Sequence, residues 1–594
     1  MFQSFDATAS PEQGPPRLAA LREAMAEAGF DAFLVPRADR FQGEFVAPAD
    51  ERLAWLTGFT GSAGLAVICT DTAGIFVDGR YRLQVRDQVA EEFATLDPAE
   101  TKPGAWLTEN VGRQAKVGFD PWLHTVDGIT KLTNAIGDHA VLQPTDNLVD
   151  RIWTDRPARP VQTVRAHPLE LSGEKSSSKR KRLAQELKDA GQRAAILTLP
   201  ESICWLLNIR GGGIPRSPVV QAFAILHDTG RVSLFSSPEK FEHLGPDPNI
   251  DLKDEDAFGS AVGRLEGPVR VDEQTAPWKI AEILEDRAVW DNDPCFMPKA
   301  CKNDAEIEGM QSAHLRDGAA MVEFLAWFDK EAPKGGLTEI SAARALEEFR
   351  ARAGDLMDVS FDTISGSGPN AAIIHYRVSE QTDRKIRTGE LYLVDSGGQY
   401  IDGTTDVTRT LAVGEPSDVH RDCYTRVLQG LIAVSLARFP SGRAGRDIDA
   451  LARAALWRKG LDYDHGTGHG VGACLNVHEG PQRISPTGMA SLKPGMILSN
   501  EPGHYRPGEF GIRIENLLVV RKDGESMDKR SRLCFETLTY VPFDRRLIDA
   551  RLLGPWERNW IDAYHSEVRE KIGDLLSASA RRWLDAATET LDWR

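Results

Sequence analysis

Two segments of the chain repeat one order of predicted elements, and this repeat constrains the fold more than any other feature. An amphipathic stretch at 17–27 precedes DAFLV and RLAWLTGFTG, and a similar stretch at 179–189 precedes AAILT and SICWLLNIRGG. Trp55 and Trp205 take the same place in the two copies. Any α/β domain alternates helix and strand, but the shared Trp-Leu dipeptide favours a repeat. The sequence therefore predicts two similar α/β domains.

The length of the chain leaves room for more than these two domains. It has 594 residues, whereas a single core rarely grows past about 300 residues and a typical domain has about 150. A proline-rich stretch at 155–172 and the segment DNDPCFMPKACK at 291–302 interrupt the pattern. Together they predict an N-terminal α/β domain, a second α/β domain and a larger third domain with a helical tail, at 1–158, 159–302 and 303–594.

Composition excludes several classes of partner. Asp and Glu number 88 against 71 Lys and Arg, a formal charge of −17, so the chain has no overall attraction for nucleic acid or anionic lipid. No apolar run reaches the roughly 18 residues of a membrane span. Seven scattered cysteines form no CxxC pair, and the first residues lack the pattern of a secretion signal. We expect a cytoplasmic protein with reduced thiols.

Two aspartates mark the third domain as the informative one. LYLVDSGGQY reads as a buried strand that reaches Asp395, and GTTDVTRTLAV as a strand that starts with Asp406. Strands joined by a short Gly-rich connection pair antiparallel, which would put both carboxylates near one end of a sheet. Burying two carboxylates together is costly unless a cation neutralises them. A turn or capping role is the alternative for either residue.

Three more residues fit the same chemistry. In HGTGHGVG, glycines on both sides of His469 permit turns that aim its ring inward, although a solvent-facing loop histidine is the alternative. MILSNEPGHY ends an apolar strand at Glu501, and FGIRIENLLVV places Glu515 within an apolar strand. A mid-strand carboxylate needs a cation or an arginine, and Arg513 on the same face is the alternative partner.

These five residues together predict a site for two metal ions. Four carboxylates and one imidazole leave two or three negative charges beside one divalent cation, and two cations balance the set. Oxygen-rich ligands favour Mn²⁺, Co²⁺ or Fe²⁺ over thiolate-bound zinc. Two metals about 3.5–4 Å apart activate water and stabilise an oxyanion, which suits amide hydrolysis. The predicted metal ligands are Asp395, Asp406, His469, Glu501 and Glu515.

The motifs VDSGGQY, GTTDVTRT, GTGHGVG, NEPG and RIEN resemble the dinuclear site of "pita-bread" metallopeptidases. WLTGFTGSAG, FVDGRY, SICWLLNIRG and the AYH…VRE tail extend the resemblance over nearly the whole chain. The chain is most similar to the long, three-domain, cytosolic type of Xaa-Pro aminopeptidase. The resemblance implies an α/β protein, in which two domains like the creatinase/prolidase N-terminal domain precede an α+β pita-bread catalytic domain.

The resemblance also implies a role for each site residue. One metal would be bound by Asp406, His469 and Glu515. The second would be bound by Asp395 and Glu501, with bridging from Asp406 and Glu515. His375 would contact the substrate, His478 would orient the scissile carbonyl, and Glu501 would move a proton. His465, Arg513 and Tyr505 would bind substrate. The pocket for the proline would be lined by His465, with Phe361 and His375 as candidate walls. A structural loop histidine is the alternative for each of His375, His465 and His478.

The implied activity is release of the first residue from peptides with proline second, by metal-activated hydroxide attack on the Xaa-Pro bond. Two divalent ions are expected, Mn²⁺ first, with Co²⁺ or Zn²⁺ as alternatives. The expected partners are proline-containing peptides and a second copy in a homodimer, with no nucleic acid and no membrane. A prolidase restricted to Xaa-Pro dipeptides and a metal-free peptide- or histone-binding module are the competing hypotheses. One departure stands out, because the family's NEPGYY reads NEPGHY here, with His504.

Overall fold

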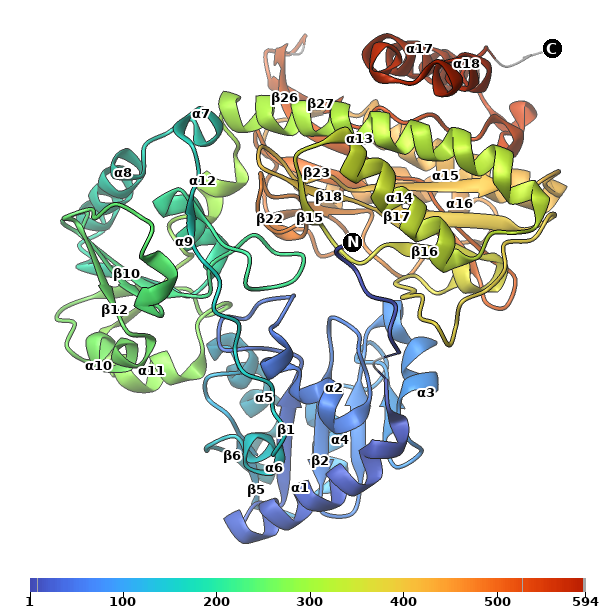
Figure 1. Ribbon diagram of the computed structural model, residues 1–594. Helices are drawn as coiled ribbons and strands as arrows, with labels where there is room; N and C mark the ends of the chain where they lie inside the picture. Colours follow the sequence, from blue (N-terminus) through green and yellow to red (C-terminus); the bar gives the residue numbers. More distant parts are fainter. Residues whose placement is uncertain (8, 526, 591–594) are drawn as a thin grey trace. The chain divides into compact units, whose positions relative to one another are not determined.

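The computed structural model describes residues 1–7, 9–525 and 527–590, and the chain forms two compact units (Figure 1). The inserted unit is Thr8–Lys299. The main unit combines Met1–Ala7 with Ala300–Arg594. The predicted boundaries at 158 and 302 stay predictions. Within the described part of the chain, no helix is both long and apolar enough to cross a membrane.

The inserted unit contains two six-stranded sheets. The first has the order β4-β3-β2-β1-β5-β6 and the second the order β12-β11-β10-β8-β13-β14. The first consists of β1 (Ala32–Pro36), β2 (Leu65–Cys69), β3 (Ala73–Phe76), β4 (Ala94–Leu96), β5 (Ala115–Phe119) and β6 (Ala140–Pro144). The second consists of β8 (Ala194–Leu197), β10 (Phe223–His227), β11 (Val232–Phe235), β12 (Ile250–Lys253), β13 (Val269–Val271) and β14 (Ala288–Trp290).

The two sheets share one topology, which confirms the predicted repeat. In each, the first three strands in chain order pair antiparallel and the other three join in parallel. The helix before the first strand is α1 (Gly14–Ala28) or α8 (Ser176–Asp189), and the helix after it is α2 (Arg52–Thr57) or α9 (Pro200–Leu207). Trp55 and Trp205 lie on these second helices.

Shorter elements complete the inserted unit. They are α3 (Gln84–Gln88), α4 (Pro103–Asn110), α5 (Val126–Ile136), α6 (Leu148–Ile152), α7 (Leu169–Ser172), α10 (Phe258–Gly263) and α11 (Trp278–Leu284), with β7 (Arg165–Ala166) paired to β9 (Ile209–Arg210). Helix α12 (Phe296–Ala300) ends where the main unit resumes.

Two long helices open the main unit and lie side by side, α13 (Asp304–Glu331) and α14 (Glu339–Ala353) (Figure 1). Both begin where side chains satisfy the first backbone N–H groups. Asn303 and Glu306 form a capping box on α13, and Thr338 and Ser341 form one on α14.

The strands of the main unit form a six-stranded antiparallel sheet and three smaller sheets. The large sheet has the order β20-β27-β26-β23-β21-β22. Its strands are β20 (Arg438–Pro440), β21 (Gly468–Gly470), β22 (Glu479–Ile484), β23 (Ile497–Asn500), β26 (Asn516–Glu525) and β27 (Ser531–Thr537). The small sheets pair β16 (Ile364–Ser367), β17 (Leu391–Ser396) and β19 (Val407–Ala412); β15 (Leu356–Val359) and β18 (Gly398–Tyr400); and β24 (Gly503–Arg506) and β25 (Phe510–Arg513).

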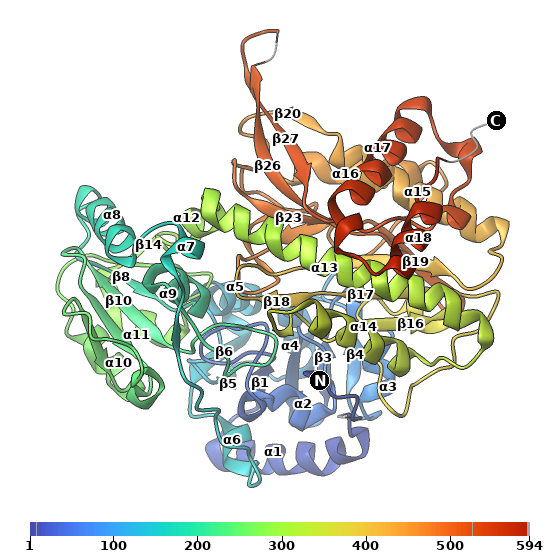
Figure 2. The same ribbon diagram turned by 45° about the horizontal axis from the view of Figure 1, so that its top comes forward.

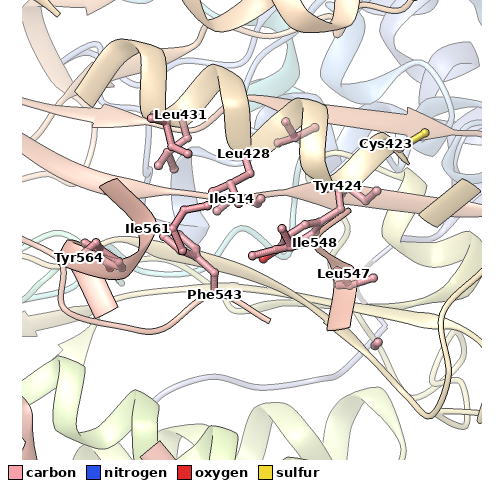
Figure 3. Packing of buried hydrophobic residues seen from close by; sticks show 14 of the residues in the cluster. Cys423, Tyr424, Leu428, Leu431, Ile514, Phe543, Leu547, Ile548, Ile561 and Tyr564 are labelled. Carbon is pink, nitrogen blue, oxygen red and sulfur yellow. The ribbon is translucent and has the colours of Figure 1, made fainter. Parts of the chain in front are cut away.

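An apolar cluster joins the helices of the main unit to its strands (Figure 3). Leu428 and Leu431 on α15 (Asp418–Ser435) pack with Ile514, and with Ile561 on α17 (Pro555–Ile572). Burial of such side chains stabilises the fold by about 1.5–3 kcal/mol each. The helical tail, α17 and α18 (Ala578–Ala587), therefore belongs to the core of this unit (Figure 2).

Candidate metal centre

The structure brings the five predicted metal ligands together. They form overlapping groups in which the ligand atoms lie within 4.8 Å of one another. The groups are Asp395, Asp406 and Glu515; His469, Glu501 and Glu515; and Asp406, His469 and His478.

The two aspartates owe their proximity to strand register. Strands β17 and β19 pair antiparallel, with Asp395 opposite Thr408 and Ser396 opposite Val407. Asp406 directly precedes β19 and so lies beyond the last pair, near Asp395. The antiparallel pairing that the sequence predicted here is confirmed.

Glu515 lies at a change of sheet, whereas the sequence predicted a position within one continuous strand. Strand β25 ends at Arg513 and pairs with β24, while β26 begins at Asn516 and pairs with β23 and β27. The backbone N–H of Glu515 donates to the carbonyl of Thr408 on β19 at 3.1 Å. The Thr408 hydroxyl donates to Glu515 Oε2 at 2.8 Å. Glu515 thus lies between β25 and β26, and Thr408 of the three-stranded sheet β16-β17-β19 binds one of its carboxylate oxygens.

His469 lies on a short strand, β21, rather than in the predicted glycine loop. Gly468 permits this, because a Cβ there would lie 1.9 Å from the carbonyl oxygen of Ser499. His469 Nδ1 lies 3.0 Å from the carbonyl oxygen of Gly470, a contact that requires the proton on Nδ1. Nε2 then presents its lone pair at 3.4 Å from Asp406 Oδ2 and 3.5 Å from Glu501 Oε1.

Arg513 pairs with Asp395, so it is not the partner of Glu515 that the sequence left open. Its Nη2 donates to Asp395 Oδ2 at 2.6 Å, and its Nη1 donates to the Tyr505 hydroxyl at 2.7 Å. That hydroxyl lies 2.9 Å from His465 Nε2. Burial lowers the pKa of Arg513, but Tyr505 and Asp395 outweigh burial and hold that pKa well above its usual value. Burial raises the pKa of Tyr505 to about 12.

The remaining predicted residues lie at different depths around this cluster. Glu501 directly follows β23, and its Oε1 accepts a hydrogen bond from Ser499 Oγ at 3.0 Å. The His478 ring meets His469 edge to face at a centroid distance of 4.2 Å. His375 and Phe361 are half-buried and belong to none of the three groups. Their contacts with substrate stay predictions, as do those of His465, Arg513 and Tyr505.

Unpaired carboxylate oxygens show that this cluster fits divalent cations. Asp395 Oδ1, Asp406 Oδ1 and Glu515 Oε1 are buried and accept no hydrogen bond from any residue in the described part of the chain. Burial, followed by repulsion from neighbouring carboxylates, raises the pKa of Asp406 and of Glu515 well above the usual range. Like charges this close need a cation, and the oxygen-rich set suits hard or borderline divalent metals.

The sequence did not predict the residues that form hydrogen bonds to the predicted site residues and support them. Thr408 contacts both Glu515 and Arg513. Arg453 on α16 (Arg446–Trp457) donates to the carbonyl of His465 at 2.7 Å and to Asp449 at 2.8 Å. The sequence signal for Asp449 and Arg453 is an acidic and a basic residue four positions apart on an amphipathic helix. Such a spacing usually indicates an ion pair on the protein surface.

His504, the departure from the family motif, does not face the cluster. It lies on β24 opposite Ile512, while Tyr505 lies opposite Gly511. Side chains alternate along a strand, so His504 points away from Tyr505 and Arg513. Its ring meets Phe510 instead, and burial lowers its pKa.

Family models match successive parts of the chain. Residues 17–152 and 155–306 each match a creatinase/prolidase N-terminal domain, and residues 308–522 match metallopeptidase family M24. Residues 531–591 match the C-terminal region of that peptidase family. The predicted fold class, two similar α/β domains before an α+β pita-bread domain, is confirmed.

Relatives match over nearly the whole chain. Aminopeptidase P2 of Arabidopsis thaliana is 38% identical over 96% of this chain and 87% of its own length. A probable Xaa-Pro aminopeptidase P of Paracoccidioides brasiliensis is 39% identical over 97% of this chain and 99% of its own. The crystal structure of X-prolyl aminopeptidase from Caenorhabditis elegans, described as a cytosolic enzyme with a dinuclear active site, is 34% identical over 97% of this chain and 100% of its own, with a TM-score of 0.92. The chain therefore belongs to metallopeptidase family M24, in its full-length Xaa-Pro aminopeptidase group.

Proposed function

We propose that this protein releases the N-terminal residue from peptides that carry proline at the second position. The observation that carries the proposal is the cluster of four carboxylates and one imidazole, with three buried oxygens that lack partners in the described chain. The names of the full-length relatives support the same activity and bond.

The ligand set would hold two divalent ions, and we propose Mn²⁺ for both, with Co²⁺ or Zn²⁺ as alternatives. When bound, such a pair supplies an activated water and stabilises negative charge on the scissile carbonyl oxygen. Asp406, His469 and Glu515 would hold one ion. Asp395 and Glu501 would hold the other, with Asp406 and Glu515 shared between the two.

The side chains around the metals would carry the proton and place the substrate. Proline makes a tertiary amide without an N–H, and its nitrogen, like that of any amide, must receive a proton to leave as an amine. Glu501 is suited to move that proton, because one carboxylate beside the metals can serve both as a ligand and as a base. His478, against the ring of His469, would orient the scissile carbonyl. His375 would contact the substrate, and His465 would line the proline side.

Arg513 would fix the position of a metal ligand relative to the proline pocket. It bonds Asp395 on one side and Tyr505 on the other, and Tyr505 contacts His465. A ligand of the second metal and a wall of the proline pocket would thus share one rigid support. We assign Arg513 and Tyr505 to positioning in addition to the predicted substrate binding.

A peptide panel would test the activity. We expect purified protein with Mn²⁺ to release the first residue from Xaa-Pro-Yaa peptides, and to leave Xaa-Ala-Yaa peptides intact. Parallel runs with Co²⁺ and Zn²⁺ rank the metals, and elemental analysis should find two ions per chain. Hydrolysis of Xaa-Pro dipeptides alone would identify a prolidase. Absence of any bindable transition metal would favour the binding-module hypothesis.

We further propose that the protein is a cytoplasmic homodimer. The cytosolic description of the worm enzyme supports the location. Light scattering coupled to size exclusion should give twice the mass of 65.4 kDa. A mass equal to one chain at micromolar concentration would contradict the dimer.

A further inference from the structure

The segment that carries His375 has no helix or strand of its own. Between the 3₁₀ turn Gly368–Ala372 and β17 the described chain forms only one isolated bridge, Thr338 with Lys385. One local turn spans His375, because the backbone N–H of Tyr376 donates to the carbonyl of Ile373 at 3.0 Å. Tertiary contacts from two places in the main unit also support this segment.

The first support is Glu339, the buried first residue of α14. Its Oε2 accepts hydrogen bonds from the Tyr376 hydroxyl at 3.0 Å and from the backbone N–H of Arg384 at 3.2 Å. Its Oε1 accepts from the N–H of Ser367 at 2.6 Å and from the amide of Asn370 at 3.1 Å. One carboxylate thus binds the segment on both sides of His375.

The second support comes from the opposite end of the sequence. The carbonyl of Phe5 accepts a hydrogen bond from the backbone N–H of Glu380 at 2.8 Å. Phe5 is 5% exposed and belongs to one apolar cluster with Tyr376, Val378 and residues of α14. The guanidinium of Arg344, on α14, lies 5.4 Å from the centre of the Phe5 ring. Phe5 therefore packs on the residues that immediately follow His375.

Gln3 anchors this N-terminal stretch. Its Oε1 accepts from the N–H of Thr363 at 3.0 Å. Its Nε2 donates to Glu347 Oε2 at 3.0 Å and to Thr363 Oγ1 at 3.2 Å. A buried amide with both its oxygen and its nitrogen bonded has one preferred position. Residues 2–5, here called the N-terminal strap, are fixed to α14 and to the chain just before β16.

We propose that the N-terminal strap positions His375 for substrate, with Phe5 as the positioning residue and Gln3 as its anchor. The proposal rests on the proposed function, which gives His375 its contact with the peptide. Removal of the Phe5 ring would leave a cavity beside Tyr376, into which the segment can relax. A displacement of about 1 Å at a group that orients substrate can cost about a hundredfold in rate.

The kinetic test compares Phe5→Ala with Phe2→Ala. Both remove one phenylalanine ring from the strap, but the ring of Phe2 belongs to a residue that is 44% exposed. We expect Phe5→Ala to lower kcat/KM on an Xaa-Pro-Yaa peptide by at least about tenfold, with bound metal unchanged. Phe5→Leu should recover part of the loss, and Phe2→Ala should match wild type. Wild-type kcat/KM in Phe5→Ala would overturn the proposal.

A double-mutant cycle separates positioning from a general loss of stability. In a His375→Ala background, Phe5→Ala should change kcat/KM by less than about twofold, because the group it positions is gone. If Phe5→Ala costs the same factor in both backgrounds, it acts on the fold at large, and the proposal fails.

Hydrogen exchange gives a readout that does not depend on activity. Residues 373–384 should exchange faster in Phe5→Ala than in wild type, and no faster in Phe2→Ala. Equal exchange rates of these residues in all three proteins would contradict the proposed role of the strap, even if the peptidase assay succeeds. Faster exchange confined to Phe5→Ala, in a protein that cleaves no Xaa-Pro bond, would support the strap and contradict the proposed function.

Discussion

Asp395 and Glu515 use their two oxygens in different ways. One oxygen of each is held by the protein, Asp395 Oδ2 by Arg513 and Glu515 Oε2 by Thr408. The other oxygen of each is buried and bonds no residue in the described chain. Such a division fixes the direction of a carboxylate while leaving one lone-pair face for a cation.

Asp406 is the ligand whose loss should be most informative. Asp406→Asn keeps the shape of the side chain and removes its charge from the centre of the cluster. We expect activity to fall more than about a hundredfold, because even a residue behind a metal ligand can cost that much. In the presence of EDTA the variant should melt at a higher temperature than wild type, since repulsion among buried carboxylates is relieved. Full activity with Mn²⁺ would show that the site is misassigned.

Thr408 should affect metal affinity rather than stability alone. Thr408→Val removes the hydroxyl that donates to Glu515 Oε2 with little change in volume. We expect Mn²⁺ affinity, measured by calorimetric titration, to fall by about 10- to 100-fold. Thr425→Val on α15 is the matched control, because among the described residues that buried hydroxyl bonds only α15 and the backbone of Leu547 and Asp549. Equal losses of affinity in both variants would count against a role for Thr408 at the metals.

At the scale of elements, α17 links stability to pH through His565. Its Nε2 accepts a hydrogen bond from the N–H of Phe543, and burial, with help from nearby arginines, lowers its pKa to about 3. The folded protein keeps this ring neutral, whereas the unfolded chain binds a proton below 6.5. Stability is therefore complete above pH 6.5 and declines as the pH falls from there toward about 3.

His565→Gln should weaken this pH dependence, because glutamine keeps an acceptor and does not titrate. Between pH 6.5 and about 5 we expect wild type to lose about 2 kcal/mol more of its free energy of unfolding than the variant. Denaturant melts at several pH values measure the difference. Parallel curves for the two proteins would refute the assignment to His565.

The sequence predicted elements well where one local signal was enough. The two Trp-Leu segments indicated the repeat, and the short Gly-rich connection between the strands of Asp395 and Asp406 predicted their antiparallel pairing. It failed where a distant segment decides the outcome. The apolar run around Glu515 looks like one strand, because nothing local records that its two halves pair with different sheets. The strap was missed for the same reason, since the partners of Phe5 lie more than 300 residues away.

At the scale of the whole molecule, metal should stabilise one unit and not the other. All five predicted ligands belong to the main unit. A ligand that binds only the folded form raises its stability with concentration. In calorimetric melts we expect one transition to move down when EDTA replaces Mn²⁺, and another to stay in place. A uniform shift of the whole melting profile would contradict this division.

Residues 8–299 interrupt the main unit, because its first seven residues and the rest are separated by that whole stretch of sequence. On the ribosome, Gln3 and Phe5 emerge before the inserted unit, whereas Glu347, Tyr376 and Glu380 follow only after the inserted unit has been synthesised. Domains fold largely in the order in which they appear, and closing a long loop costs entropy. The N-terminal strap should thus be among the last segments to dock. The segment that carries His375 would therefore gain its native contacts only after it has been synthesised.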